Sequence, residues 1–354
     1  MILYVYVVLS FTFAFTSLAV SLHFLEHHEA GDLPLLWASI SAPWALKPFL
    51  GLLVDCAWGR PRWICLGFVC GGISFALAPL SHIWIIVGST WVCLGDCAAD
   101  ALMVEMAREQ EGLQRKTIGA RALGTLLGTL LGGIVYTWGY GLVMRGVAVP
   151  LLSMGVGALD LPNLPRTCAY PTWSWKLVSL QVIGFLLAAT PGADTFILLA
   201  WKEQLSSITI ALASLSGQVG VVLGLWFGKS LRRDLSIWMA LTSGMLVSLS
   251  AGMTPWSPLF FAVVQNFVGG VGGALFTAPL IEEVSETVRG HEAFTFAACM
   301  ASVNLGGIVS SALEAEIMKG AGIQSVEDDP LPLVGISVIL GMISFPLGTW
   351  FARV

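Results

Sequence analysis

The chain of 354 residues is 56% hydrophobic and only 11% charged, whereas soluble domains carry about 25% charged residues. This composition excludes a soluble fold, and the mean hydropathy of +0.83 predicts an integral membrane protein. The net charge of -5 is spread over short connections, so the sequence offers no basic patch for nucleic acid.

Apolar runs divide the chain into about twelve predicted spans, since a helix needs roughly 20 apolar residues to cross the hydrocarbon. Within the hydrocarbon, the backbone groups at an open sheet edge would lack hydrogen-bond partners. We therefore predict an all-α membrane fold whose outer surface contacts membrane lipids. The predicted spans are residues 2–25, 33–54, 62–80, 83–106, 118–138, 140–160, 176–202, 206–228, 234–253, 257–281, 292–313 and 331–352.

The first predicted span begins directly at the N-terminus. No Lys or Arg precedes the run from Ile2 to Leu22, unlike the basic start of a cleaved signal peptide. We therefore count this run as a span, which makes the number of spans even. A targeting presequence ahead of this chain stays an open alternative.

The basic residues predict the orientation, because Lys and Arg in short loops stay on the cytosolic side. With the N-terminus inside, thirteen basic residues fall on the cytosolic side and three on the opposite side, namely Arg145, Lys202 and Lys319. Both termini are therefore predicted to face the cytosol. The sequence leaves open whether the membrane is the plasma membrane or a plastid envelope, and it leaves the oligomeric state open.

An internal repeat indicates two halves. Residues 51–63 at the end of the second span resemble residues 224–238 at the end of the eighth, at an offset of 173 to 175 residues. We predict two six-helix bundles, residues 1–160 and 176–354, joined by a cytosolic linker over 161–175. In such parallel-repeat transporters the substrate site lies between the halves near the midplane.

Two aspartates lie one helical turn apart in the fourth span, at Asp96 and Asp100. A charge at bilayer depth costs from about 3 to over 10 kcal/mol, so both side chains should face a cavity or a partner. Two carboxylates this close repel, which favours a proton shared between them and a role as proton acceptor. The alternative is a structural ion pair with a basic neighbour.

Two cations are predicted at similar depth, Lys47 in the second span and Arg121 in the fifth. Either could neutralise the two aspartates or receive the carboxylates of an anionic substrate. The alternative for Lys47 is a long side chain that reaches the cytosolic interface. Arg121 lies close to the end of its span, so the same alternative applies to it.

Other polar groups are predicted in the second half. Pro191 should kink the seventh span, because it lacks a backbone donor, and Asp194 would then point into a cavity. Gln265, Asn266 and Asn304 are amides within spans that either bind substrate or join helices.

Glycines spaced four residues apart predict close helix packing in the fifth span, at Gly124, Gly128 and Gly132, and in the tenth, at Gly269 and Gly273.

No arrangement typical of an enzyme, a metal site or a cofactor is visible in the sequence. The seven cysteines lack ligand spacing and are interpreted as small packing residues. The five histidines are scattered at the ends of spans, at positions 23, 27, 28, 82 and 291. We therefore predict a transporter without a cofactor, and not an enzyme.

Two adjoining motifs near the second span carry a family resemblance. One is Gly51-x-x-x-Asp55-x-x-x-Gly59-Arg60-x-Arg62, which is similar to the loop signature of the major facilitator superfamily with one extra residue before the glycine. The other, directly upstream, is Pro43-Trp44-x-x-Lys47-Pro48-x-x-Gly51. Together they resemble the folate-biopterin transporter family within that superfamily.

Three further segments are similar to this family in the expected order: residues 95–105 with the two aspartates, Arg121 before a glycine-rich face, and residues 302–311. The resemblance covers roughly residues 34–313. It implies a secondary transporter that moves folate or pterin-type solutes by alternating access. Proton symport and facilitated exchange are both open, and the alternatives are transport of another organic anion or a transport-inactive sensor.

The sequence departs from the family pattern in two places. The aromatic run expected after Asp194 is reduced to Phe196 and Trp201, and Glu282 and Glu283 stand where the family is usually apolar. These departures concern the identity of the substrate more than the fold.

The predicted site has two parts. The substrate and proton pathway is predicted at Lys47, Asp96, Asp100, Arg121, Asp194, Gln265 and Asn304. A gating cluster is implied by the superfamily resemblance at Asp55, Arg60 and Arg62, for which a solvated loop is the alternative.

The predicted orientation can be tested by labelling engineered cysteines. Asp32→Cys and Asp329→Cys should react with an impermeant thiol reagent from outside, because both lie in acidic loops opposite the basic side. Arg232→Cys should react only after permeabilisation. Labelling of all three from one side would contradict the orientation.

Overall fold

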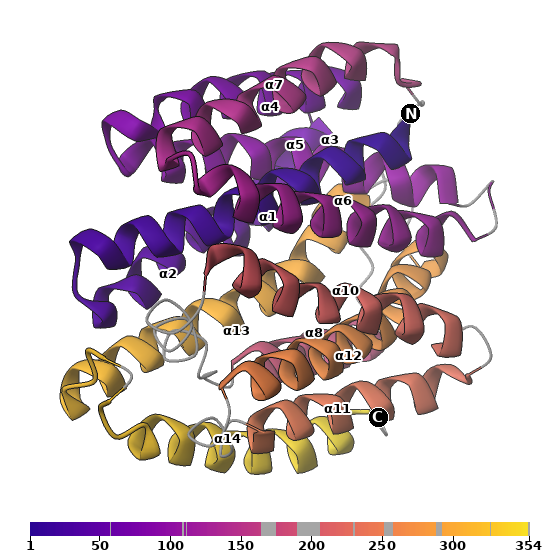
Figure 1. Cartoon of the computed structure of the whole chain (residues 1–354). Helices are drawn as coiled ribbons and strands as arrows, with labels where there is room; N and C mark the ends of the chain where they lie inside the picture. The colour runs from indigo at the N-terminus through magenta and orange to yellow at the C-terminus, as the bar shows by residue number, and fades with distance from the viewer. Residues whose placement is uncertain are drawn as a thin grey trace.

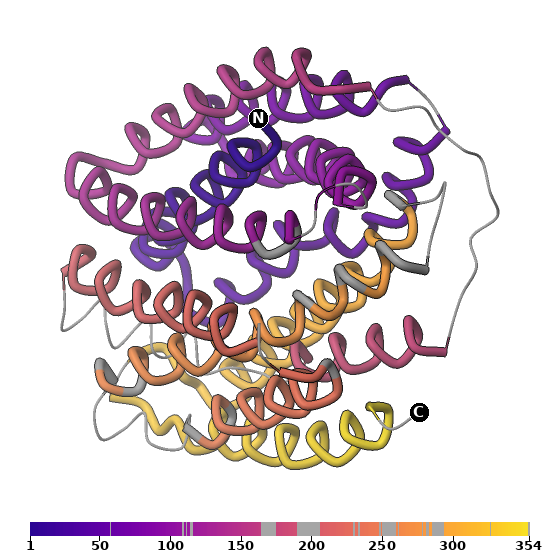
Figure 2. Tube along the Cα trace, turned by 90° about the vertical axis from the view of Figure 1, so that its right-hand side faces the viewer, coloured from indigo at the N-terminus to yellow at the C-terminus, as the bar shows by residue number. Residues whose placement is uncertain are grey.

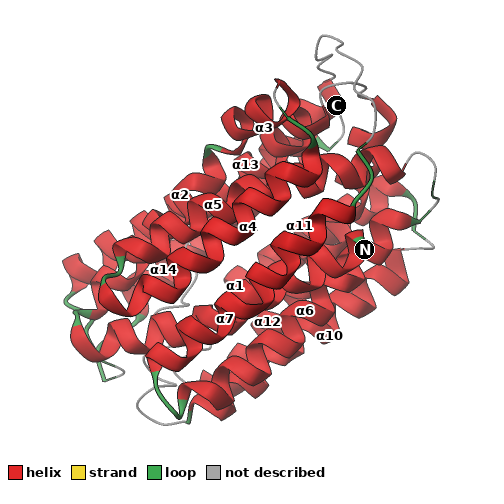
Figure 3. Cartoon of the chain, turned by 90° about the horizontal axis from the view of Figure 1, so that it is seen from above, coloured by secondary structure: helices red, strands yellow, loops and turns green. Residues whose placement is uncertain are grey.

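The computed structural model describes residues 1–56, 58–107, 110, 112–163, 175–189, 206–228, 231–250, 258–287, 292–325 and 327–352. Over these residues the chain is helical, without a strand, and the helices run along a common direction (Figure 3). Eight of them are long and apolar enough to cross a membrane. The predicted all-α membrane fold is therefore confirmed.

Thirteen α-helices occur in the described residues, and every predicted span overlaps at least one of them. They are α1 (Ile2–His27), α2 (Leu33–Ala45), α3 (Lys47–Cys56), α4 (Arg60–Leu77), α5 (Ile83–Ala107), α6 (Leu113–Tyr136), α7 (Tyr140–Gly157), α8 (Trp175–Ala188), α10 (Ser207–Gly228), α11 (Arg233–Ser250), α12 (Pro258–Thr287), α13 (Glu292–Ala321) and α14 (Leu331–Phe351). Short 3-10 turns are η1 (Ala30–Asp32), η2 (Ala78–Leu80) and η3 (Ala158–Asp160).

The helix contacts repeat between the two halves of the chain. In the first half α1 packs against α6 and α4 against α7, and at the equivalent positions of the second half α8 packs against α13 and α11 against α14. Helices α1 to α7 occupy the upper part of Figure 1 and α8 to α14 the lower part, a division also visible in Figure 2. The bundle boundaries near residues 160 and 176 stay predictions.

The most extensive contacts between the halves are those of α6 with α10 and of α13 with both α2 and α3, and smaller ones join α5 with α12 and α13. Near the C-terminal end of α13, Lys319 Nζ lies 2.7 Å from Asp32 Oδ1. Close by, the amide of Ala30 donates to Gln324 Oε1 at 3.1 Å. Figure 1 marks both chain termini at the same end of the bundle, as an even number of spans requires.

The second predicted span is broken at Leu46, between α2 and α3. Pro48 has no amide hydrogen to donate to the carbonyl of Trp44, and that carbonyl instead accepts a 3.2 Å hydrogen bond from Asn304 Nδ2 of α13. The thiol of Cys97 lies 3.8 Å from the carbonyl of Lys47. The sequence predicts one continuous helix here, so this break is new, while the kink predicted at Pro191 lies outside the described residues.

The glycine face predicted in α6 is confirmed. Gly124, Gly128 and Gly132 lie against the backbone of α1, where a Cβ on any of them would collide with a carbonyl. Such direct backbone contact is available only to glycine.

The face predicted in α12 is wrong. A Cβ on Gly273 would meet nothing within 4 Å, whereas Gly270 lies against the backbone of Gly217 in α10. Spacing alone does not reveal how a helix is rotated about its axis. In α12 the rotation turns Gly270, and not Gly269 or Gly273, toward α10.

The α1–α6 contact predicts a site-specific loss of stability. Gly128→Val should lower the free energy of unfolding by about 1–3 kcal/mol, because the side chain must force the two helices apart. Gly119→Val is the matched control, since a Cβ at Gly119 of the same helix would meet nothing within 4 Å. Thermal unfolding in detergent would measure both. Equal melting temperatures of the two variants would contradict the packing.

Candidate functional site

Four charged side chains meet in the interior of the first half. Lys47 at the start of α3 contacts Asp96 Oδ2 and lies 3.1 Å from Asp100 Oδ2, both on α5. Arg121 Nη2 of α6 lies 3.1 Å from Asp96 Oδ1 and 2.9 Å from Asp100 Oδ1. Each cation therefore bridges both carboxylates. We call these four residues the charge cluster.

The charge cluster is buried but open on one side. Asp96 is 0% exposed, and Lys47 and Asp100 are each 2% exposed, while the side chain of Arg121 is 37% exposed. The two positive charges balance the two negative charges, and such compensation is needed because burying an unpaired charge costs several kcal/mol. The guanidinium of Arg121 is the member that a solute can reach.

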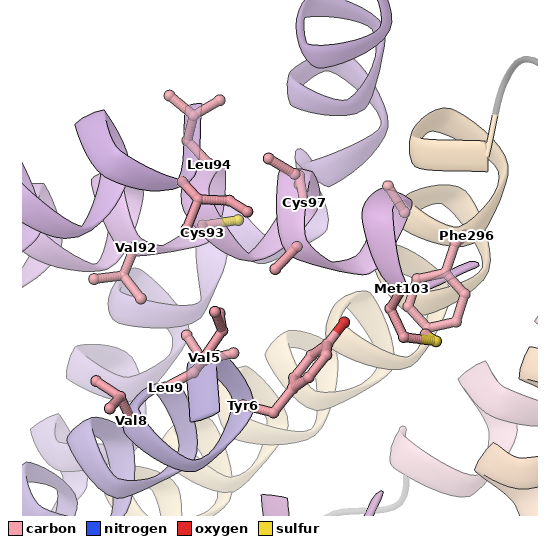
Figure 4. Packing of buried hydrophobic residues seen from close by; sticks show 14 of the residues in the cluster. Val5, Tyr6, Val8, Leu9, Val92, Cys93, Leu94, Cys97, Met103 and Phe296 are labelled. Carbon is pink, nitrogen blue, oxygen red and sulfur yellow. The ribbon is translucent and has the colours of Figure 1, made fainter. Parts of the chain in front are cut away.

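Two aromatic residues support the cluster. The hydroxyl of Tyr6 in α1 donates to Asp100 Oδ1 at 2.8 Å, and the Arg121 guanidinium lies 4.5 Å from the centre of its ring. Lys47 Nζ lies 4.8 Å from the centre of the Trp44 ring. Figure 4 shows the Tyr6 hydroxyl directed from α1 toward α5, near Met103 and Phe296.

Sequence reasoning missed Tyr6 as a site residue. The sequence gives little signal for it, because the first span also holds the phenol of Tyr4 and several hydroxyl side chains, and its partner Asp100 lies 94 positions away. In the sequence Trp44 stands out only as part of the motif that resembles the family.

The charge cluster forms one wall of a cavity of about 390 Å³ between the halves. The second half contributes Gln218 of α10, Thr277 of α12, and Phe296, Met300 and Asn304 of α13. Pockets of about 300–1,000 Å³ are typical of sites for small organic ligands.

A second cavity, of about 560 Å³, adjoins the first and shares Trp44, Arg121 and Asn304 with it. Its wall is rich in hydroxyl groups. They belong to Ser10, Ser17, Ser21, Ser41, Thr125, Thr129 and Ser214. Arg121 thus lies where the two cavities meet.

The other residues predicted for the pathway differ in whether they line a cavity. Asn304 lines both cavities. Gln265 is half-buried in α12 and is not among the described residues that line either cavity, and Asn266 donates within its own helix to the Ala262 carbonyl at 2.8 Å. Asp194 lies outside the described residues.

Of the three residues predicted for gating, Asp55 and Arg60 lie together in the structure and Arg62 does not join them. Asp55 Oδ2 accepts a 3.1 Å hydrogen bond from the amide of Phe294 in the first turn of α13. Arg60 lies 3.4 Å from Asp55 Oδ1 and also contacts Glu105 of α5. Both Asp55 and Arg60 are buried, which argues against a solvated loop, whereas Arg62 is exposed on α4. A carboxylate at a helix N-terminus is favoured by the helix dipole.

Comparisons with known proteins agree with this architecture. No family model matches the chain. A folate-biopterin transporter from Synechocystis sp. is 24% identical over an alignment 342 residues long, and the match covers 84% of this chain and 69% of that protein. The crystal structure of a mutant of the nucleoside transporter NupG superimposes with a TM-score of 0.72 at 12% identity, covering 99% of this chain and 98% of that chain.

The chain therefore has the same fold as this transporter over nearly its whole length, which confirms the predicted fold class. Its resemblance to a folate-biopterin transporter is confirmed as a distant sequence relationship.

Proposed function

We propose that this chain carries a folate or a pterin-type organic solute across a membrane by alternating access. The observation that carries the proposal is the charge cluster, which presents Arg121 to a cavity walled by both halves. The distant relationship to a folate-biopterin transporter supports the choice of solute.

Arg121 is suited to receive a carboxylate of the solute. A guanidinium forms paired hydrogen bonds with a carboxylate, and this one is partly exposed to both cavities. A glutamate tail could occupy the hydroxyl-lined cavity while the heterocycle occupies the smaller one.

The smaller cavity offers groups that match a pterin ring. Trp44 and Phe296 provide aromatic surface for a flat heterocycle. The amides of Gln218 and Asn304 can both donate and accept hydrogen bonds, as the edge of a pterin requires.

Binding of an anionic solute would favour binding of a proton, because the solute changes the balance of charges in the charge cluster. When a solute carboxylate pairs with Arg121, the two aspartates share only Lys47 as a full counter-ion. The excess negative charge then favours protonation of one aspartate. A proton moving down 100 mV supplies about 2.3 kcal/mol, which corresponds to roughly fifty-fold accumulation.

Rocking of the halves would alternate access to this cavity. The bond between Asp55 and the first turn of α13 crosses between the halves, so it must break if α3 and α13 separate at that end. Asp55 and Arg60 are accordingly assigned to gating and Arg62 to the exposed surface.

Uptake of radiolabelled solutes in a folate-auxotrophic host tests the substrate. Folic acid and biopterin should enter and an unrelated dicarboxylate should not. Arg121→Gln should reduce folate uptake at least about ten-fold, the equivalent of 1.4 kcal/mol, and biopterin uptake less, because only folate carries the glutamate carboxylates. Arg145→Gln, at an exposed arginine of α7, is the matched control and should transport normally.

The folate assignment would be abandoned if neither pterin compound accumulated or competed at millimolar concentration while the protein reached the membrane intact. The fold assignment would be unaffected by that result.

Proteoliposomes with an imposed pH gradient test the coupling. Asp100→Asn should abolish proton-driven accumulation but retain solute exchange, because exchange requires binding without a cycle of protonation. Asp160→Asn, at the exposed end of η3, should leave both activities unchanged. Unchanged accumulation in both Asp96→Asn and Asp100→Asn would remove the aspartates from the coupling mechanism and favour facilitated exchange.

A further inference from the structure

Three histidines at the C-terminal end of α1, His23, His27 and His28, meet a fourth from another segment, His82, away from the charge cluster. The rings of His23 and His27 lie 4.5 Å apart between centroids. His82, between η2 and α5, brings its ring to 6.0 Å from His23 and 5.7 Å from His28. The proposed transport mechanism uses none of these residues.

Two of the histidines and a glutamate form a group with metal-ligand spacing. The ligand atoms of His23, Glu26 and His27 all lie within 4.8 Å of one another, and no second group of this kind occurs in the residues that the structure describes. Positions i, i+3 and i+4 share one face of a helix. Glu26 and His27 are exposed, so small side-chain rotations can bring the three groups to metal bonds of about 2.1 Å.

Each of the three side chains is already oriented by a neighbour. The Nδ1 of His27 donates to the carbonyl of His23 at 2.8 Å, which leaves Nε2 with its lone pair free to bind. The hydroxyl of Tyr136 in α6 donates to Glu26 Oε1 at 3.0 Å, and the ring of His23 stacks on Tyr140 of α7 at 4.1 Å. Supporting hydrogen bonds of this kind accompany most histidine and carboxylate ligands in metal sites.

We propose that His23, Glu26 and His27 bind a divalent transition-metal ion, with Zn²⁺ as the test ion. Imidazole and carboxylate donors suit Zn²⁺, Ni²⁺ and Cu²⁺, and Zn²⁺ is commonly bound by two histidines and one glutamate with a fourth position left to water. The ion would join the last turn of α1 to α6 and α7 through Tyr136 and Tyr140. This binding does not depend on the identity of the transported solute.

Zinc binding to the purified full-length protein tests the proposal. The protein would carry an affinity tag without histidines, and Zn²⁺ would be titrated in competition with a chromogenic chelator. One equivalent should bind to the wild type, and His27→Ala should weaken binding at least about ten-fold. His28→Ala is the matched control, because it removes an exposed imidazole at the same helix end but outside the group, and it should bind like the wild type.

A second variant separates ligand orientation from general damage to the fold. Tyr136→Phe removes only the hydroxyl that holds Glu26 and should weaken zinc binding by about ten-fold or more. Its helical content and elution volume should match those of the wild type.

Cobalt spectroscopy separates this site from the cysteines of the chain. The Co²⁺ complex should show ligand-field bands without a thiolate charge-transfer band, since the proposed ligands are nitrogen and oxygen. A thiolate band, stoichiometric binding that survives the double change His23→Ala and His27→Ala, or no binding by the wild type would each overturn the proposal.

Discussion

Two aspartates on α5 can stay buried between helices only because a lysine of α3 and an arginine of α6 compensate their charge. In a bundle surrounded by hydrocarbon, an uncompensated carboxylate would cost several kcal/mol. The three helices are thereby held in one arrangement, and α1 is added to it through Tyr6. The same contacts make the cluster sensitive to any anion that competes for Arg121.

The break between α2 and α3 links this cluster to the other half of the molecule. It places Lys47 at the first position of α3 and leaves the Trp44 carbonyl without its helical partner. Asn304 of α13 donates a hydrogen bond to this carbonyl. Farther along the same two helices, Asp55 binds the first turn of α13. A movement of α13 away from α3 would therefore break the gating contact and change the cavity wall at the same time. Alternating access requires this coupling between opening of the cavity and movement of the halves.

Hydropathy predicts the spans of this chain well, because the thickness of the hydrocarbon sets a minimum length of apolar sequence. It also predicts that Asp96 and Asp100 need partners. Spacing alone predicts the glycine face of α6 but not that of α12, where the rotation of the helix turns Gly270 toward its neighbour. Rotation about a helix axis depends on all the packed faces at once, so a local pattern cannot supply it.

The sequence by itself determined the number of spans, the repeat of two halves and the presence of charges that must be compensated, since each follows from local composition and the properties of lipid. The tertiary structure alone decided that one lysine and one arginine bridge both aspartates, that Tyr6 joins them, and that histidines from two segments meet beside Glu26. These contacts join residues up to 94 positions apart, and only the packing of the helices brings such residues together.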